Sequence, residues 1–467
     1  MTIAELYQSR KNDPCWNTSY PISPSDWATY CVPGPLSFEN DHRMSFYIHI
    51  PFCKQLCSFC EYTRMLSPDE NVQRDYLFAI ANDIEQFKQQ YKDVTLLGFD
   101  IGGGTPTSLS EKNFSLLMQI YQNAISGLGL DDKYEPSIEG TFNTLSEQKL
   151  EAMSKNGFHR LSLGVQSSCN SVLHQHQRGS SNKAIMSSWL EKAWEKGIKK
   201  VNLDFMYGLN GQNELTIRQD LELISRLRPQ QVTLYELRTN MISAKESFSK
   251  EELFDQYVQY YNGLIALGYY ARFGQNTFSV DATDEGVSSY LRERMLYGAA
   301  YKGFGLSAQS MSSSGIAYNK GKLAVTPQNE LNKEGYPELF TYLLPPTELA
   351  SKYMAISAYN GSFSIARLRD YGISERSLNE TLSFCIEEGL LYKGERDRMF
   401  ITKNGFKHYG ALFSLFYSKN KYNQEEIISC PPKEKGSPKT IKTFIVSFLL
   451  MPIIKNSLLS NYTLGSL

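Results

Sequence analysis

A repeated alternation of short apolar strands and longer amphipathic helices, between Met44 and Gly268, constrains the fold most. Strands are predicted at 45–50, 95–101, 137–140, 160–165, 200–206 and 231–237. Helices are predicted to follow them at 75–91, 112–124, 147–156, 184–196, 215–226 and 250–267. Strands that alternate with helices form a parallel sheet, so six such units indicate an α/β fold with an incomplete (β/α) barrel. The active site of such a barrel lies at the C-terminal ends of its strands.

The segments on either side of the predicted barrel, 44–268, have different patterns. Residues 1–43 contain prolines and little periodicity, which favours an extended N-terminal arm. Residues 269–344 are rich in Gly and Ser and are interpreted as a barrel extension on the substrate side. We expect a small helical domain at 345–418 and a poorly ordered tail at 419–467, which is rich in Lys, Asn and Ser.

The small C-terminal domain has a winged-helix pattern. Two helices are predicted at 363–371 and 374–388, and a two-stranded wing at 389–392 and 398–402. Winged helices often bind DNA, but the second helix carries several glutamates, among them Glu380 and Glu387, which would repel phosphates. This composition favours a packing or lid module.

Three cysteines follow the first predicted strand with the spacing C-x3-C-x2-C: Cys53, Cys57 and Cys60. Ferredoxin-type [4Fe–4S] clusters take four cysteine ligands. Three thiolates can hold three irons of such a cluster and leave the fourth iron open to a small ligand, which is a catalytic arrangement. Half of a zinc site or chance core cysteines are the alternatives, although zinc motifs usually contain a second Cys or His pair.

Unusual residues also end the next predicted strands. The second strand runs into Gly102–Thr105, a turn whose exposed backbone groups could clamp the amino and carboxylate groups of a ligand. The following strands end in Glu139, Gln166 and Asp204, and Arg178 could bind a carboxylate in bidentate fashion. Each alone could be a cap, a turn former or a solvated side chain. Successive strand ends nevertheless meet at one barrel mouth, which indicates a binding site.

Together these motifs resemble those of radical S-adenosylmethionine (SAM) enzymes similar to oxygen-independent coproporphyrinogen III oxidase. The resemblance runs roughly from residue 14 to 418 and rests on five segments: Tyr47–Phe52 before the cysteines, Gly102–Thr107, Arg160–Ser167, Asn202–Gly208, and Thr18-Ser19-Tyr20-Pro21 in the arm. It implies a radical SAM barrel with a [4Fe–4S] cluster on the three cysteines. It also implies reductive cleavage of SAM to a 5′-deoxyadenosyl radical that abstracts hydrogen from the substrate.

The resemblance further implies ligands for two SAM molecules. By motif position, the cluster-bound SAM would be held by Tyr47, Gly103 and Glu139. The second SAM would be held by Phe59, Gly104, Thr105, Gln166, Arg178 and Asp204. A further position of that second site, near Arg238, does not match clearly.

Two departures from the oxidase pattern bear on the reaction. Tyr62 stands where the oxidase has one more cysteine, and residues 272–278 replace its Asp-His-Phe-Ala segment. We therefore rank C-methylation or a related carbon modification of a sizeable organic substrate first, with the second SAM as methyl donor. Oxidative decarboxylation of coproporphyrinogen III to protoporphyrinogen IX and a haem-chaperone role are the alternatives.

Composition narrows the expected cellular context. The net charge of −1 gives no reason to expect a nucleic-acid partner, and clustered cysteines imply a reducing compartment. The N-terminus has no apolar signal core, and the apolar segment 444–454 is too short to span a bilayer. We expect a cytoplasmic enzyme without a membrane span, acting on a sizeable organic or tetrapyrrole substrate with a reductant such as flavodoxin or ferredoxin.

Overall fold

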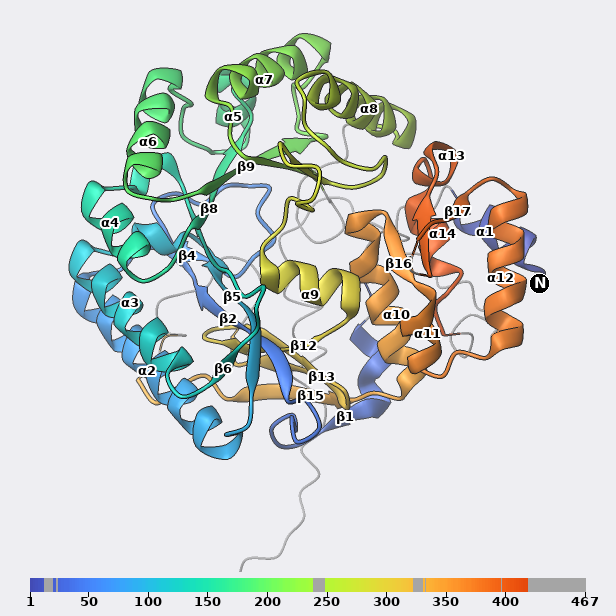
Figure 1. The fold of residues 1–467 in the computed structure, drawn as a ribbon, viewed down its shortest axis with the longest axis horizontal. Coiled ribbons are helices and arrows are strands. Elements are labelled where there is room, and N and C mark those ends of the chain that lie inside the picture. The colour runs from blue at the N-terminus through green and yellow to red at the C-terminus, as the bar shows by residue number, and fades with distance from the viewer. Residues whose placement is uncertain are drawn as a thin grey trace, which may run out of the picture. The chain divides into compact units, whose positions relative to one another are not determined.

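Six parallel strands form the centre of the fold (Figure 1). Their order in the sheet is β2 (Arg43–Ile50), β5 (Thr95–Gly103), β7 (Pro136–Gly140), β8 (Arg160–Gln166), β9 (Lys200–Tyr207) and β10 (Gln231–Glu236). The predicted strands and the incomplete parallel barrel are therefore confirmed. This computed structural model describes residues 1–11, 20–21, 24–237, 248–321, 331, 333–395 and 397–418.

Helices cover the outer face of the barrel (Figure 1). They are α2 (Glu70–Gln90), α3 (Glu111–Ile125), α4 (Glu147–Lys155), α6 (Lys183–Glu195), α7 (Glu214–Leu227) and α8 (Lys250–Ala266). All six were predicted, and side chains such as Asp69 and Ser110 cap their first turns. Alternation along β2 sends Phe46 outward onto Phe87 of α2, with ring centroids 5.5 Å apart. The same alternation turns Tyr47 and His49 towards the lumen.

Residues 269–344 extend the sheet at both edges. Beyond β2 the sheet continues through β12 (Ala300–Phe304), β13 (Gln309–Ser312), β14 (Gly315–Asn319) and β15 (Glu338–Leu343), and β1 (Cys31–Val32) of the N-terminal arm forms that edge. At the other edge, β11 (Thr277–Ser279) pairs with β10. The helix α9 (Ser289–Tyr297) lies inside the curve of the sheet, against β5, β2 and β7 (Figure 1). A Cβ at Gly98 would lie 2.3 Å from the backbone nitrogen of Tyr290, so β5 admits α9 only with glycine there. These strands and α9 were not predicted individually.

The N-terminal arm is more regular than predicted. Residues Ile3–Arg10 form α1, because the side chains of Thr2 and Glu5 cap each other's backbone groups, and Pro24–Tyr30 form a 3-10 helix. Arg10 donates hydrogen bonds to Ser414, 404 residues away, at 2.8 and 3.0 Å. The prediction of an irregular arm was therefore wrong for these residues, whereas Thr18 and Ser19 lie outside the described residues.

Helices and a three-stranded sheet follow the barrel along the chain, within the same compact unit. The elements are α10 (Pro346–Ser357), β16 (Ser362–Ser364), α11 (Ile365–Asp370), α12 (Glu375–Glu387), β17 (Leu391–Lys393), β18 (Arg398–Ile401), α13 (Lys403–Phe406) and α14 (Tyr409–Ser414). The predicted helix pair and wing are present. The first helix begins two residues later than predicted, because residues 362–364 pair with β18. The domain boundaries stay a prediction, and the predicted tail, 419–467, lies outside the described residues.

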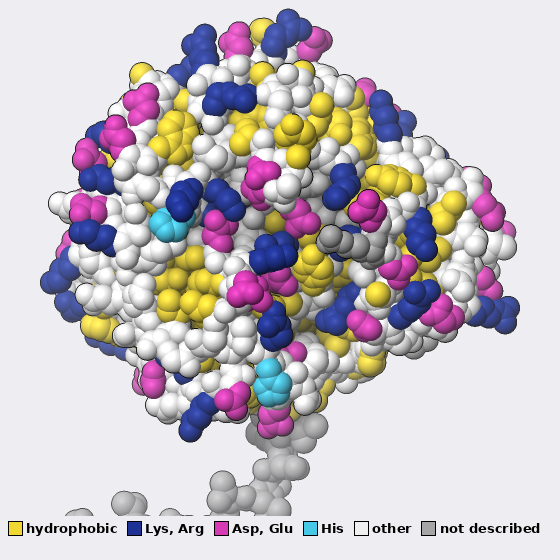
Figure 2. Space-filling model, viewed as in Figure 1, with side chains coloured by type: hydrophobic (Ala, Val, Ile, Leu, Met, Phe, Trp, Pro, Cys, Tyr) yellow, Lys and Arg dark blue, Asp and Glu magenta, His cyan; other side chains and the backbone are white. Residues whose placement is uncertain are grey.

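Charges of both signs are interspersed over the molecular face in Figure 2, which has the same orientation as Figure 1. None of the helices in the described part of the chain is long and apolar enough to cross a membrane.

A buried carboxylate of α10 fastens the N-terminal arm to that helix. Glu348 accepts hydrogen bonds from the Tyr20 hydroxyl at 2.5 Å and from the Trp27 indole N–H at 2.9 Å. Glu348→Ala should lower the free energy of unfolding by about 2–4 kcal/mol, because it leaves buried donors without acceptors. Glu380→Ala, which removes an exposed partner of Arg376, should cost less than about 1 kcal/mol. Urea unfolding followed by tryptophan fluorescence measures both, and equal losses would contradict the anchoring role.

Candidate functional site

The cysteine loop leaves the C-terminal end of β2 and closes on itself. Two short strands, β3 (Phe52–Cys53) and β4 (Met65–Leu66), pair in parallel at its base. Within the loop, Cys53 and Cys57 are buried and Cys60 is partly exposed. The backbone of Ser58 donates to the carbonyl of His176 at 3.0 Å, which ties the loop to the segment after β8.

Two of the three thiols receive hydrogen bonds from residues predicted to bind SAM. The Thr105 hydroxyl lies 3.6 Å from Cys53 Sγ, and a terminal nitrogen of Arg178 lies 3.6 Å from Cys57 Sγ. Arg64, which was not predicted as a site residue, donates to the Cys57 carbonyl at 2.9 Å. Burial raises the pKa of the Cys53 thiol to about 11, and its hydrogen bond from Thr105 opposes this shift.

The glycine turn after β5 packs directly on the cysteine loop. Gly104 donates to the carbonyl of Ile50 at 2.8 Å, and Thr105 donates to the carbonyl of Phe52 at 2.8 Å. Gly103 has a φ of +111°, and a Cβ there would lie 2.3 Å from the ring of His49. A side chain at Gly103 would therefore separate the turn from the loop.

His49 links the loop to Tyr47. Its Nε2 lies 2.8 Å from the Thr63 carbonyl, and its Nδ1 lies 3.3 Å from the Tyr47 hydroxyl. A carbonyl only accepts, so Nε2 carries the proton and Nδ1 accepts from Tyr47. Burial lowers the pKa of His49 to about 4, which keeps the ring neutral. His49 thus fixes the direction of the Tyr47 hydroxyl and was not predicted as a site residue.

Two predicted carboxylates face the lumen close to this turn. Glu139 accepts a hydrogen bond from Gly103 N at 3.1 Å. Asp204 accepts from the Ser162 hydroxyl at 3.1 Å and from the Asn202 amide at 2.8 Å. Burial raises the pKa of Glu139 to about 7, with repulsion from Asp204 as the next cause, and burial raises the pKa of Asp204 to about 6.

Gln166 ends β8 in a left-handed conformation, with a φ of 72°. Its buried Oε1 has no hydrogen-bond partner in the described part of the chain. The fully buried Asp220 of α7 holds the next residues, because it accepts hydrogen bonds from the Ser167 hydroxyl at 3.2 Å and the Tyr260 hydroxyl at 2.6 Å. Arg178 donates to the carbonyl of Gly164 just before this turn. Gln166 therefore presents an unused acceptor beside Arg178.

The structure brings the predicted site residues together around one end of the barrel. Among the predicted site residues, Phe59 packs against a buried apolar cluster, which consists of Val172, Met206, Leu209 and Leu237. Ser162 and Asn202 were not predicted as site residues, although they lie in the segments Arg160–Ser167 and Asn202–Gly208 on which the resemblance rests. Polar residues at every second position of an otherwise apolar strand would have identified them, since such residues share the lumen face.

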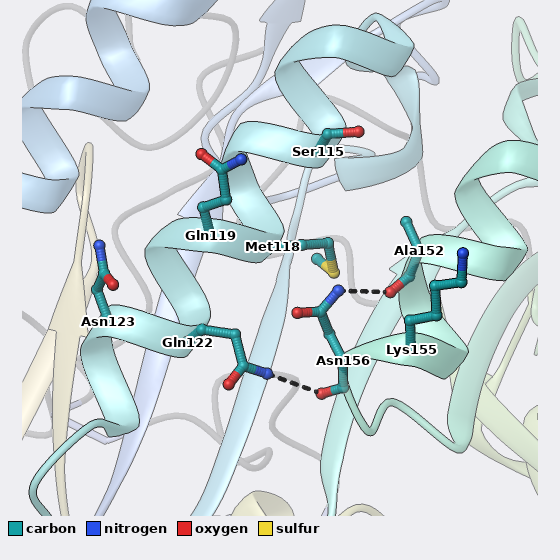
Figure 3. Close-up of a pocket in the computed structure, with 8 residues that line it drawn as sticks. All are labelled: Ser115, Met118, Gln119, Gln122, Asn123, Ala152, Lys155 and Asn156. Carbon is teal, nitrogen blue, oxygen red and sulfur yellow. Dashed lines mark hydrogen bonds between the residues drawn. The ribbon is translucent and has the colours of Figure 1, made fainter.

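A shallow pocket lies on the outside of the barrel, between α3 and α4 (Figure 3). Amide side chains line it, and Gln122 and Asn156 use theirs to bond backbone carbonyls at 3.3 and 2.8 Å. The Gln122 bond joins α3 to the end of α4, whereas the Asn156 bond to Ala152 closes the last turn of α4. The pocket is therefore a feature of helix packing.

Residues 47–224 match the family model described as the radical SAM superfamily. The matched segment contains the cysteine loop, the glycine turn and all the predicted site residues.

Two curated relatives illustrate the similarity. The haem chaperone HemW of Bacillus subtilis is 31% identical over 193 residues, which are 41% of this chain and 50% of the relative. The anaerobic coproporphyrinogen III oxidase 1 of Cereibacter sphaeroides is 29% identical over 230 residues, which are 47% of this chain and 48% of the relative. The chain thus spans about half of the length of these relatives.

The fold matches that of the coproporphyrinogen III oxidase HemN from Escherichia coli. The TM-score is 0.66 at 21% identity, over 82% of this chain and 92% of that one. The predicted radical SAM fold is therefore confirmed. Methyl transfer, which we ranked first from the sequence, has no support among these relatives.

The superfamily implies a [4Fe–4S] cluster and SAM, and the residues present fit both. Thiols suit iron–sulfur clusters, and Thr105 and Arg178 already direct donors at two of them. No group of three or more His, Cys, Asp or Glu in the described ranges is arranged to hold a single metal ion. An iron–sulfur cluster does not require the three cysteines to converge on one ion, because each cysteine binds a different iron. The unused acceptor of Gln166 and the lumen carboxylates suit a ligand that carries an amine.

Replacing one cysteine should remove the cluster. Cys57→Ala should yield protein without the brown iron–sulfur chromophore and without SAM cleavage, because only two thiolates remain in the loop. Cys31→Ala is the matched control, since Cys31 is exposed on the edge strand β1. Absorption spectra and iron analysis of anaerobically reconstituted protein measure the effect. A full cluster on Cys57→Ala would refute the ligand assignment.

Asp204→Asn should stabilise the cluster-free protein at high pH but weaken SAM binding. Because the folded-state pKa of Asp204 is about 6, above its unfolded value, the wild type loses stability as pH rises from about 4 to about 6. The Asn variant has no such titration and should therefore be more stable than the wild type at pH 8. We expect a difference in the free energy of unfolding of about 1–2 kcal/mol, a value reduced by solvent screening of the partly exposed side chain. Urea unfolding from pH 4 to pH 8 measures the difference. A stability difference independent of pH would contradict the prediction.

Proposed function

We propose that this chain is a radical SAM enzyme that modifies carbon in a carboxylate-bearing tetrapyrrole. The observation that carries the proposal is the cysteine loop packed on the glycine turn, with Glu139 and Asp204 beside it. The tetrapyrrole rests on the relatives, one named as a haem chaperone and the other as a coproporphyrinogen oxidase.

Bound cluster and SAM would together supply an electron and a 5′-deoxyadenosyl radical that abstracts hydrogen from the substrate. Cys53, Cys57 and Cys60 would hold the cluster. Glu139 would accept from an amino group, and Tyr47, whose proton is engaged by His49, would offer an oxygen lone pair to the same ligand. Arg178, beside Cys57, would bind a carboxylate.

A second SAM would use the residues on the β8–β9 side. Gln166 Oε1 is a buried acceptor in want of a donor, and Asp204 is a carboxylate that a cationic ligand would stabilise. Phe59 supplies an apolar surface next to them. These features support a second SAM site.

Haem binding without radical chemistry is the second candidate, because the identity to HemW is 31%. It predicts a haem complex whose formation is independent of SAM cleavage. A one-electron donor such as flavodoxin or ferredoxin would be the partner in the enzymatic case only.

An anaerobic assay with dithionite, SAM and coproporphyrinogen III distinguishes these functions. We expect 5′-deoxyadenosine from the wild type and none from Cys57→Ala. Carbon dioxide and protoporphyrinogen would identify decarboxylation, and S-adenosylhomocysteine with a methylated tetrapyrrole would identify methyl transfer. Absence of 5′-deoxyadenosine from protein with a full cluster would refute the enzymatic proposal. A stoichiometric Soret change on haem titration would then leave the chaperone.

A further inference from the structure

An arginine on α9, Arg294, lies inside the barrel and has no role in the site described above. Its guanidinium lies over the ring of Tyr301 at 4.6 Å and near that of Tyr290 at 6.0 Å. One terminal nitrogen donates to the Tyr290 hydroxyl at 3.3 Å, and the other donates to Gln309 Oε1 at 3.2 Å. The side chain is therefore held in one orientation by neutral groups.

Arg294 has no carboxylate within ion-pair distance among the described residues. The neighbouring Arg292, by contrast, pairs with Glu293 at 3.0 Å. The Nε of Arg294 is buried and has no acceptor among the described residues. A guanidinium that has lost much of its water without gaining an anion is unfavourable. The two aromatic rings offset this cost only in part.

The remaining donors of Arg294 suit an anion. A guanidinium has five N–H groups, and the contacts to Tyr290 and Gln309 use one on each terminal nitrogen. A second N–H on each terminal nitrogen is left, which is the pair that binds both oxygens of a carboxylate. Gln309 cannot turn away, because the Tyr301 hydroxyl also donates to its Oε1 and its amide donates to the Tyr318 hydroxyl at 2.7 Å.

Arg294 is close to the predicted SAM site. The ring of Tyr290 stacks on the ring of Tyr47, with centroids 5.7 Å apart and an angle of 23° between the planes. Arg294 is thus separated from Tyr47 by a single aromatic ring. Tyr62, whose surface is 53% exposed, lies within electrostatic range of Arg294, Tyr47 and Tyr235. The exposed Tyr62 therefore lies near both Tyr47 and Arg294.

We propose that Arg294 binds a carboxylate of the substrate and so selects acidic substrates for this barrel. The inference rests on the proposed function for the nature of the substrate, a tetrapyrrole with propionate groups. It names the residue that would orient such a substrate beside Tyr47, on the side of the lumen away from Gln166 and Asp204.

Fluorescence quenching with coproporphyrin III, and with its uncharged tetramethyl ester, tests the assignment on cluster-loaded protein. The wild type should bind the acid more tightly than the ester. Arg294→Gln should weaken binding of the acid by about 10- to 100-fold and leave binding of the ester unchanged. Arg294→Lys should restore part of the preference, because a lysine keeps the charge but loses the paired N–H groups.

Arg292→Gln is the matched control, since it removes the same charge from the same helix, and it should bind like the wild type. SAM cleavage in the absence of porphyrin should persist in Arg294→Gln. If the wild type binds neither porphyrin, the tetrapyrrole substrate is refuted. If the wild type prefers the acid and Arg294→Gln keeps that preference, only the role of Arg294 is refuted. Loss of SAM affinity in Arg294→Gln would also overturn it, because the anion would then be SAM.

Discussion

The close approach of two strand ends is the constraint on which the site depends. The backbone at Gly102–Gly104 takes space beside Glu139, His49 and Pro51 that any Cβ would occupy. This contact lets backbone N–H groups of the glycine turn bond the cysteine loop. The cysteine loop and Tyr47 of β2, the glycine turn of β5 and Glu139 of β7 thus meet at the ends of three adjacent strands. Backbone contacts between the glycine turn and the cysteine loop therefore fix the positions from which the side chains of the site project.

The lumen holds three carboxyl groups whose charged form is disfavoured by burial. Asp100, Glu139 and Asp204 all have raised pKa values because of burial. Arg160 lies among them but donates to Ser137 and Gln231 rather than to a carboxylate. A cationic ligand would offset this cost near Glu139 and Asp204, whereas Arg294 offers a site for an anion elsewhere on the lumen face. The charges of the lumen are thus divided between two regions that suit different ligands.

The barrel could be predicted because its strands are apolar and its outer helices are amphipathic. Both patterns depend only on residues that are close in the sequence. The same logic failed for α9. This helix packs inside a polar lumen, so Tyr290 and Arg294 face inward where an outer helix would present an apolar stripe. Strand-end residues such as Glu139 and Asp204 could be predicted, since parallel strands end together. Asp220 could not, because it reaches Ser167 from a helix 53 residues further along the chain.

The two ends of the described unit are fastened to each other, and this bears on the order in which the protein is made. Tyr20 can form its hydrogen bond only after Glu348, 328 residues later, has been synthesised. Arg10 likewise requires Ser414, 404 residues later. At ribosomal rates of about 5–20 residues per second, roughly 20–70 s separate synthesis of the cysteine loop from synthesis of α14. During that interval the loop exists without the arm in place. Delivery of iron and sulfide can therefore precede the docking of the arm on Glu348 and Ser414.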